Sequence, residues 1–176
     1  MRYLTAVAVA VTIALAGLVL QVANLPGPQP EAIQVTPVDA RQIAYGVATE
    51  SAARVLVANG CPDTYASLAG RAAVDEGIQA DVVAGVIVVE SSCNPLAVSP
   101  AGAVGLMQIN LHVWHISRRQ ALDPETNIRI GTKILVGYIR PHGLREGIHR
   151  YNGLGVDCAY CDGGYTAHVM YAANRR

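Results

Sequence analysis

The stretch ESSCNPLAVSPAGAVGLMQI, residues 90–109, decides how this chain folds and works. It opens with Glu90, which ends the apolar run ADVVAGVIVV. We expect a helix over 80–92. On such a helix, the residues three, four and seven positions before Glu90 share its face, and these are the apolar Ile87, Val86 and Val83. Burial beside such a stripe raises the pKa of a carboxyl group, as a general acid near neutral pH requires. Glu90 is therefore the candidate catalytic acid, and the competing interpretation is a glutamate that ends the helix in contact with water or a neighbour.

The residues after Glu90 suggest a loop that can approach a bound chain. Pro95 interrupts the helix, and small residues follow up to Gly105, where we expect a short helix over 105–110. Glycine lets the backbone come close to a ligand. Gln108 and Asn110 carry amide groups that can bond sugar hydroxyl and acetamido groups.

The remainder of the chain predicts a mainly α-helical single domain over residues 38–176. Apolar residues recur at helical spacing between Gly and Pro breaks, and no segment shows a convincing strand alternation. Asp123 and Pro124 are typical of a helix start, and Asn59-Gly60 is typical of a helix end. Besides the helix of Glu90, we expect helices over 39–59, 62–76, 124–139, 144–151 and from 165 to the C-terminus.

The first residues are typical of a targeting segment. Arg2 precedes the uncharged apolar run 4–20, and the next charge is Glu31. Residues 1–24 are therefore interpreted as a signal peptide or as a membrane anchor through residues 4–20, and a buried core helix is the alternative. Residues 25–37 are rich in proline and predict a stiff linker. We expect an exported protein of the periplasm or cell envelope, either free or anchored in the inner membrane.

The cysteine count supports export. An even number of cysteines on an exported chain favours two disulfides, and the obvious pairs are Cys61 with Cys93 and Cys158 with Cys161. Three pairings are possible, and free or mixed thiols are the alternative. A zinc site with four cysteines normally needs two close pairs, and this chain has one. The formal net charge is zero, which argues against a nucleic-acid partner.

Three motifs in order carry a family resemblance. The chain resembles the lytic transglycosylases of the soluble-lytic-transglycosylase type, the goose-lysozyme-like muramidases, over roughly residues 75–171. The family patterns are ES, NP-x-A-x-S and GA-x-GLMQ, then N-I-x-x-G, then A-Y-N-A-G. The matching residues are Glu90-Ser91, Asn94-Pro95, Ala97, Ser99, Gly102-Ala103, Gly105-Leu106-Met107-Gln108, Asn127-Ile128, Gly131 and Tyr151-Asn152-Gly153.

The resemblance implies a lysozyme-like helical fold and a role for each matched position. Glu90 would be the single catalytic acid and base, and Ser91 would support its carboxylate. Gln108 would lie in the glycan groove, Tyr151 would stand near Glu90, and Asn152 would shape the site. Packing in the core is the alternative for Tyr151.

Other residues near the motifs have two interpretations each. Ser99 is either a substrate contact or a turn residue before Pro100, and Asn110 is a candidate substrate contact. Trp114 either stacks on a sugar ring or fills the core, whereas Met107 is expected in the core. The sequence YNGLG departs from the family's YNAGPG, and residues 155–164 form an unusual insert. These departures leave the shape of the groove rim undecided.

The implied reaction cuts the glycan strands of peptidoglycan. The bond between N-acetylmuramic acid and N-acetylglucosamine would break with formation of 1,6-anhydromuramyl ends, without a metal or organic cofactor. Asp123, Asp157 and Asp162 are candidates for a second acid, although Asp123 is better explained as a helix cap. The alternatives are a hydrolytic muramidase on the same fold and a wall-binding scaffold subunit of a secretion, conjugation or pilus apparatus.

Overall fold

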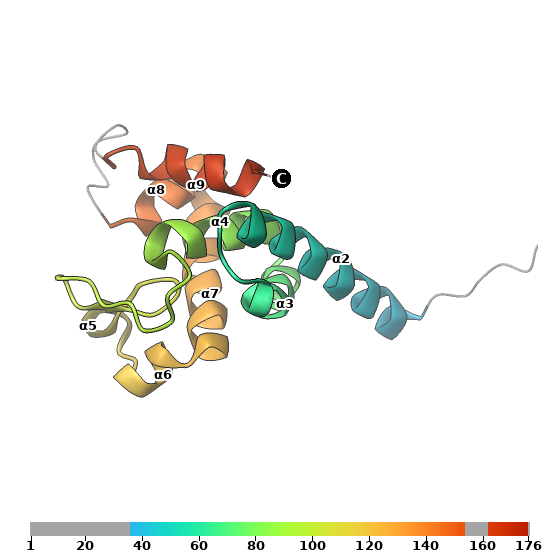
Figure 1. Ribbon diagram of the computed structural model, residues 1–176, viewed down its shortest axis with the longest axis horizontal. Coiled ribbons are helices and arrows are strands. Elements are labelled where there is room, and N and C mark those ends of the chain that lie inside the picture. The colour runs from blue at the N-terminus through green and yellow to red at the C-terminus, as the bar shows by residue number, and fades with distance from the viewer. Residues whose placement is uncertain (1–35, 154–161, 176) are drawn as a thin grey trace, which may run out of the picture. The chain divides into compact units, whose positions relative to one another are not determined.

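The described part of the chain is mostly helical, as the sequence predicts (Figure 1). A computed structural model describes residues 36–153 and 162–175. The helices are α2 (Pro37–Ala58), the short 3₁₀ helix η1 (Asp63–Tyr65), α3 (Ala66–Glu76), α4 (Ala80–Ser91), α5 (Leu111–Trp114), α6 (Arg118–Leu122), α7 (Pro124–His142), α8 (Leu144–Tyr151) and α9 (Tyr165–Asn174). Two short strands, β1 (Ala103–Val104) and β2 (Ile109–Asn110), pair antiparallel.

The predicted targeting segment, residues 1–24, lies outside the described residues, as does the expected linker up to residue 35. Among the helices of residues 36–153 and 162–175, none combines the length and apolar character needed to cross a bilayer.

Local capping explains where the long helices begin. Thr36 and Asp39 form a capping box at the start of α2, in which the Thr36 hydroxyl accepts from the Asp39 backbone N–H at 3.2 Å. At the start of α7, the Asp123 carboxylate accepts from the Thr126 N–H at 3.0 Å, and Pro124 takes the first helical position. The predicted role of Asp123 as a helix cap is confirmed.

The expected short helix over 105–110 is wrong. Residues 105–108 form the turn between β1 and β2, residues 109–110 form β2 itself, and Val104 pairs with Ile109 across the turn. Gly105 has φ +85° and Gln108 has φ +47°, and neither value fits an α-helix. The chain then forms α5 and α6, where the sequence analysis expected no helix.

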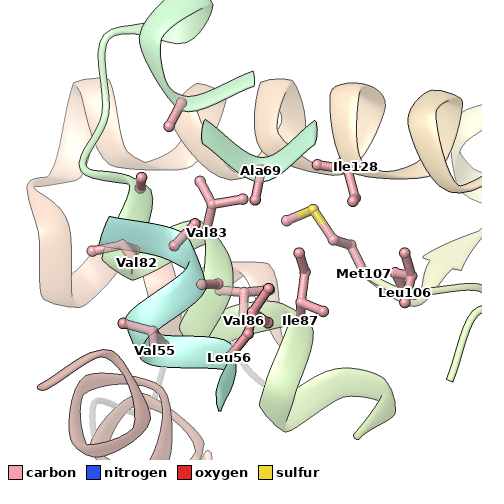
Figure 2. Close-up of a cluster of buried hydrophobic side chains, with 14 of the residues drawn as sticks. Val55, Leu56, Ala69, Val82, Val83, Val86, Ile87, Leu106, Met107 and Ile128 are labelled. Carbon is pink, nitrogen blue, oxygen red and sulfur yellow. The ribbon is translucent and has the colours of Figure 1, made fainter. Parts of the chain in front are cut away.

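The core centres on α4, which packs against α2, α3 and α9. Val83, Val86 and Ile87 are fully buried, as the predicted stripe requires. Figure 2 shows Met107 and Leu106 reaching the same cluster beside Ile87 and Ile128. Met107 is therefore a core residue, as expected.

A disulfide joins Cys61 and Cys93, whose Cα atoms lie 5.8 Å apart. This confirms the first predicted pair and excludes a zinc site made of all four cysteines. Cys61 follows α2, and Cys93 lies just beyond α4, so the bond ties the end of the helix that carries Glu90 to the end of α2. The second predicted pair, Cys158 and Cys161, lies outside the described residues.

Candidate active site

Glu90 lies in the last turn of α4, at the end of the buried stripe, and its carboxyl group is partly buried. Burial raises the pKa of Glu90 to about 7, and a hydrogen bond from Tyr165 opposes part of that shift. The Tyr165 hydroxyl donates to Glu90 Oε1 at 2.6 Å. The site thus holds one carboxyl group that is readily both protonated and ionised near neutral pH.

Tyr165 is a site residue that the sequence analysis did not identify. It begins α9, a helix that packs against α4, and it stands 75 residues beyond Glu90 in the chain. Its side chain is 8% exposed. Burial, followed by the proximity of Glu90, raises the pKa of Tyr165, so its hydroxyl stays a hydrogen-bond donor.

Asp162 fixes the first turn of α9, where Tyr165 lies. Its carboxylate accepts from the Gly164 N–H at 3.0 Å and from the Thr166 N–H at 2.9 Å. The hydrogen bonds from Thr166 hold the pKa of Asp162 well below its usual range. Asp162 also pairs with the buried His149 of α8, with 3.4 Å between Oδ2 and Nδ1. These contacts make Asp162 a capping residue, and it lines a different cavity from the one that contains Glu90.

Asn127 of α7 holds the turn that carries Gln108 in place. The fully buried Asn127 side chain accepts from the Met107 N–H at 2.8 Å and donates to the Val104 and Ala121 carbonyls at 2.9 and 2.7 Å. Met107, Val104 and Ala121 are buried, so water cannot reach their backbone groups easily. The Asn127 side chain supplies hydrogen-bond partners for all three.

Close packing completes the support of this turn. A Cβ atom added at Gly131 would lie 2.7 Å from the Met107 sulfur, so only glycine allows α7 to approach. From the other side, the Tyr151 hydroxyl donates to the Met107 carbonyl at 2.8 Å. Burial, and then the nearby Glu90, raises the pKa of Tyr151, which keeps this donor protonated. Tyr151 is thus both packed and adjacent to the acid.

Glu90 opens into a cleft of about 500 Å³. Its walls include most of the candidate residues from the sequence, namely Ser99, Gln108, Asn110, Tyr151 and Asn152, together with Ala101, Ala103, Ile109, Val113, Trp114, Ile134, Tyr138, Arg150 and Gly153. Among these lining residues of the described chain, Glu90 is the sole carboxylic acid. Asp123 lies elsewhere as a helix cap, and Asp157 falls outside the described residues.

The two amide residues that line the cleft, Gln108 and Asn110, each retain a polar atom without a hydrogen-bond partner among the described residues. Gln108 donates through Nε2 to the Gly105 and Ala97 carbonyls at 2.9 and 3.2 Å, which leaves its carbonyl oxygen for a ligand. Asn110 caps α5 by accepting from the His112 and Val113 N–H groups through Oδ1, which leaves its NH₂ group. The turn therefore offers one acceptor and one donor.

The remaining candidates differ in position. The Ser99 hydroxyl accepts from the Ala103 N–H at 3.0 Å, so Ser99 both shapes the turn and lines the cleft. The Asn152 NH₂ group donates to the Asp162 carbonyl at 3.4 Å. The Ser91 hydroxyl donates to the Ile87 carbonyl at 3.1 Å instead of reaching the carboxylate of Glu90, and Ser91 does not line the cleft. The expected support of Glu90 comes from Tyr165 instead.

The sequence profile of the transglycosylase SLT domain matches residues 67–158, which is more than half of the chain. The chain belongs to this family. The matched region includes Glu90 and the turn of Gln108 but ends before Tyr165.

The chain is also similar to three lytic murein transglycosylases. The chain is 33% identical over 110 residues to membrane-bound lytic murein transglycosylase C of Sodalis glossinidius, a match that covers 51% of this chain and 31% of the relative. It is 35% identical over 83 residues to the protein of the same name from Photorhabdus laumondii, covering 40% and 23%. It is 38% identical over 84 residues to endo-type membrane-bound lytic murein transglycosylase A of Cronobacter sakazakii, covering 41% and 40%. The chain thus spans well under half the length of these relatives.

Trp114 of this SLT domain is 40% exposed and lines the cleft. The structure therefore rejects the interpretation of Trp114 as a core residue. An exposed indole at a cleft rim is a suitable platform for an apolar face of a ligand.

Proposed function

We propose that this SLT domain is a peptidoglycan lytic transglycosylase. It cuts the β-1,4 bond between N-acetylmuramic acid and N-acetylglucosamine and leaves 1,6-anhydromuramyl ends. The observation that carries the proposal is the site of Glu90, a single carboxylic acid whose pKa is about 7 in a cleft of about 500 Å³. A group with this pKa can give up and regain a proton at neutral pH.

In the first step, neutral Glu90 donates its proton to the glycosidic oxygen, and the bond between that oxygen and the anomeric carbon breaks. The acetamido oxygen of the muramyl sugar stabilises the cationic carbon. In the second step, ionised Glu90 takes the proton of the muramyl 6-hydroxyl, whose oxygen bonds to the anomeric carbon. The acid is restored and no water is consumed, so one carboxyl group is sufficient.

Two opposing influences on Glu90 suit these two steps. Burial favours the neutral form that donates in the first step. The 2.6 Å hydrogen bond from Tyr165 stabilises the carboxylate that accepts in the second step. In this mechanism Tyr165 acts as a positioning residue, because it contacts the acid and not the sugar.

The cleft walls fit an N-acetylated glycan strand as the substrate. The free amide atoms of Gln108 and Asn110 match hydroxyl and acetamido groups, and Trp114 offers a face for a sugar ring. Asn152 and Ser99 add polar groups at the rim. The proposed chemistry requires no metal or organic cofactor.

Hydrolysis by a muramidase is the main alternative. Most hydrolytic glycosidases use two carboxylates that flank the bond. The described lining of this cleft contains Glu90 alone, which favours attack by the muramyl hydroxyl over attack by an activated water. A silent scaffold role is disfavoured because the acid and its tyrosine partner are both in place.

We further propose that the protein works in the cell envelope, where its substrate lies. Two of the relatives above are named membrane-bound lytic murein transglycosylase C. The apolar run of residues 4–20 would then be an export signal or an inner-membrane anchor. Service to a secretion, conjugation or pilus apparatus stays a prediction from the sequence.

The test is mass analysis of the products that the full-length protein releases from purified peptidoglycan. We expect 1,6-anhydromuramyl ends from the native protein, none from Glu90→Gln, and native products from Glu50→Gln, which alters an exposed acid on α2. Reducing ends would assign the protein as a hydrolytic muramidase. Activity in folded Glu90→Gln would overturn the role of Glu90.

A further inference from the structure

A second cavity lies directly beside the catalytic cleft. It measures about 450 Å³ and is lined by Trp114, Ile130, Lys133, Ile134, Gly137 and Tyr138, and we call it the side recess. Trp114, Ile134 and Tyr138 also line the cleft. Because the two cavities share these walls, they adjoin each other, and the side recess is near enough to receive a group attached to a glycan in the cleft.

The side recess is built from one face of α7, closed on one side by Trp114. Ile130, Lys133, Ile134 and Gly137 stand at positions i, i+3, i+4 and i+7, which share a helix face. Its chemistry differs from that of the cleft, whose walls carry side-chain amides. The side recess has apolar and aromatic walls and one cation, Lys133.

Lys133 is the single lysine of the 176-residue sequence, in which the other twelve basic residues are arginines. It is exposed at the side recess. Among residues 36–153 and 162–175, no carboxylate pairs with its ammonium group within 4.0 Å. The cation is therefore available to an acidic group of a ligand.

Gly137 keeps the side recess open. An added Cβ at this position would meet no atom within 4 Å, whereas at Gly131 it would collide with Met107 and at Gly147 with Ile139. Packing thus requires Gly131 and Gly147 but does not require Gly137. A glycine inside a helix lowers stability relative to alanine. A ligand that occupies the space beside Gly137 would explain why this position is glycine.

We propose that the side recess binds the stem peptide of peptidoglycan. This inference rests on the proposed function, because it places the glycan strand in the adjoining cleft. The stem peptide hangs from the lactyl group of the muramyl sugar and opens with an alanine and an acidic residue. The alanine methyl group matches the apolar walls, and the acidic residue supplies a carboxylate for Lys133.

A further sugar fits this recess less well. Sugar rings stack on aromatic side chains but also carry hydroxyl groups around their edge, and these groups lose their water unless they find polar partners. The side-chain polar atoms of the lining are the Lys133 ammonium, the Tyr138 hydroxyl and the Trp114 indole N–H. The amide groups suited to hydroxyls and acetamido groups lie in the cleft instead.

The first test compares two substrates, peptide-bearing glycan strands and strands stripped of peptides by an amidase. The readout is the ratio of kcat/KM for the two, measured with the full-length protein. We expect the ratio to fall about tenfold in Lys133→Gln, which removes one charge-assisted contact, and about as much in Gly137→Leu, which fills the side recess. The matched control is Gly46→Leu, because a Cβ at this exposed helical glycine of α2 also meets nothing within 4 Å. It should keep the native ratio.

The second test measures binding without catalysis. In full-length Glu90→Gln, an amine-reactive reagent labels Lys133 and the chain's terminal amine, and mass spectrometry separates the two sites. A disaccharide that carries the stem peptide should slow labelling of Lys133 several-fold, and the same disaccharide without the peptide should not. Labelling of the terminal amine serves as the internal reference.

The outcomes separate this inference from the proposed function. Unchanged ratios in both variants, with anhydro products still formed, would overturn the side recess and keep the transglycosylase. Equal loss on both substrates in Gly137→Leu, or protection of Lys133 by the peptide-free disaccharide, would mean that the recess holds sugar and would also overturn the inference. Protection by the peptide-bearing disaccharide, with no products from the native protein, would retain the recess and reject the reaction.

Discussion

Two hydrogen-bonded clusters of this domain have similar bond lengths but different surroundings. The Asn127 cluster, which holds the turn between β1 and β2, has three hydrogen bonds of 2.7–2.9 Å around a fully buried side chain. The Arg41 cluster, which joins α2 to α3 through Tyr45 and Asp75, has three of 2.6–2.7 Å. Its arginine and aspartate side chains are 61% and 46% exposed. The comparison therefore separates bond length from burial as a measure of how much a contact contributes to the free energy of unfolding.

Access to water determines how much stability each cluster contributes. When an exposed contact is lost, water replaces the missing partner, and exposed ion pairs contribute about 0–1 kcal/mol. When a buried contact is lost, the surviving partner has no substitute and costs about 1–3 kcal/mol. The protein should therefore depend on the Asn127 cluster far more than on the Arg41 cluster.

The largest effect is expected from Asn127→Ala. It removes the partner of the buried Met107 N–H and a donor to each of the Val104 and Ala121 carbonyls, so the free energy of unfolding should fall by about 3 kcal/mol or more. Urea denaturation measures this loss. Asn174→Ala is a suitable control, because its exposed side chain bonds only the Met170 carbonyl of its own helix. A loss below about 1 kcal/mol in Asn127→Ala would contradict the role assigned to burial.

A smaller effect, on pH dependence, is expected from Tyr165→Phe. The Tyr165 hydrogen bond lowers the pKa of Glu90 against the larger effect of burial, so its removal should raise that pKa above about 7. Activity in the native protein should decline as the pH rises through about 7, because Glu90 must be protonated to act as the acid. In the variant this decline should move upward by about one pH unit, in line with the loss of a hydrogen bond to a charged group.

The pH profile of kcat/KM on peptidoglycan measures this shift. Tyr171→Phe alters an exposed tyrosine of the same helix and should leave the profile in place. A decline that stays at the native pH in Tyr165→Phe would show that the phenol does not influence the acid.

The smallest effect is expected from Asp75→Asn in the Arg41 cluster. It removes the charge that pairs with Arg41, and the free energy of unfolding should change by less than about 1 kcal/mol. The residual effect should shrink in high salt, because the pair is exposed. Thermal unfolding at low and high ionic strength measures both points, and a large, salt-independent loss would place this cluster in the same class as Asn127.

The sequence was a good guide wherever short-range chemistry sets the structure. The start of α7 follows from Asp123 and Pro124, and the stripe that buries α4 follows from helical spacing. The disulfide of Cys61 and Cys93 was among the pairings expected. These features depend on neighbours within one or two helical turns, or on a small set of cysteine combinations.

Prediction from the sequence failed where unusual backbone angles or contacts between distant residues determine the local structure. The segment 105–110 has a plausible helical composition, but positive φ at Gly105 and Gln108 turns it back on itself, and the buried Asn127 holds that turn. The start of α6 did carry a signal, the Ser117 and Gln120 capping box, in a segment too short for a clear apolar pattern.

Tyr165 lies on a helix that was expected, but no local pattern connects it with Glu90. Packing of α9 on α4 brings the two together across 75 residues. In the same way, the shared walls of the cleft and the side recess depend on where α5 places Trp114 relative to α7.

The disulfide also records where a given copy of the protein has been. Structural disulfides form and persist in oxidising compartments, whereas the cytosol generally keeps thiols reduced. Cys93 follows Glu90 by three positions, so the covalent bond lies at the end of α4, the helix that carries Glu90. A copy with oxidised Cys61 and Cys93 has reached an oxidising compartment, and a copy with free thiols there has not completed its maturation. The oxidation state of this one pair therefore reports the redox history of a given copy of the protein.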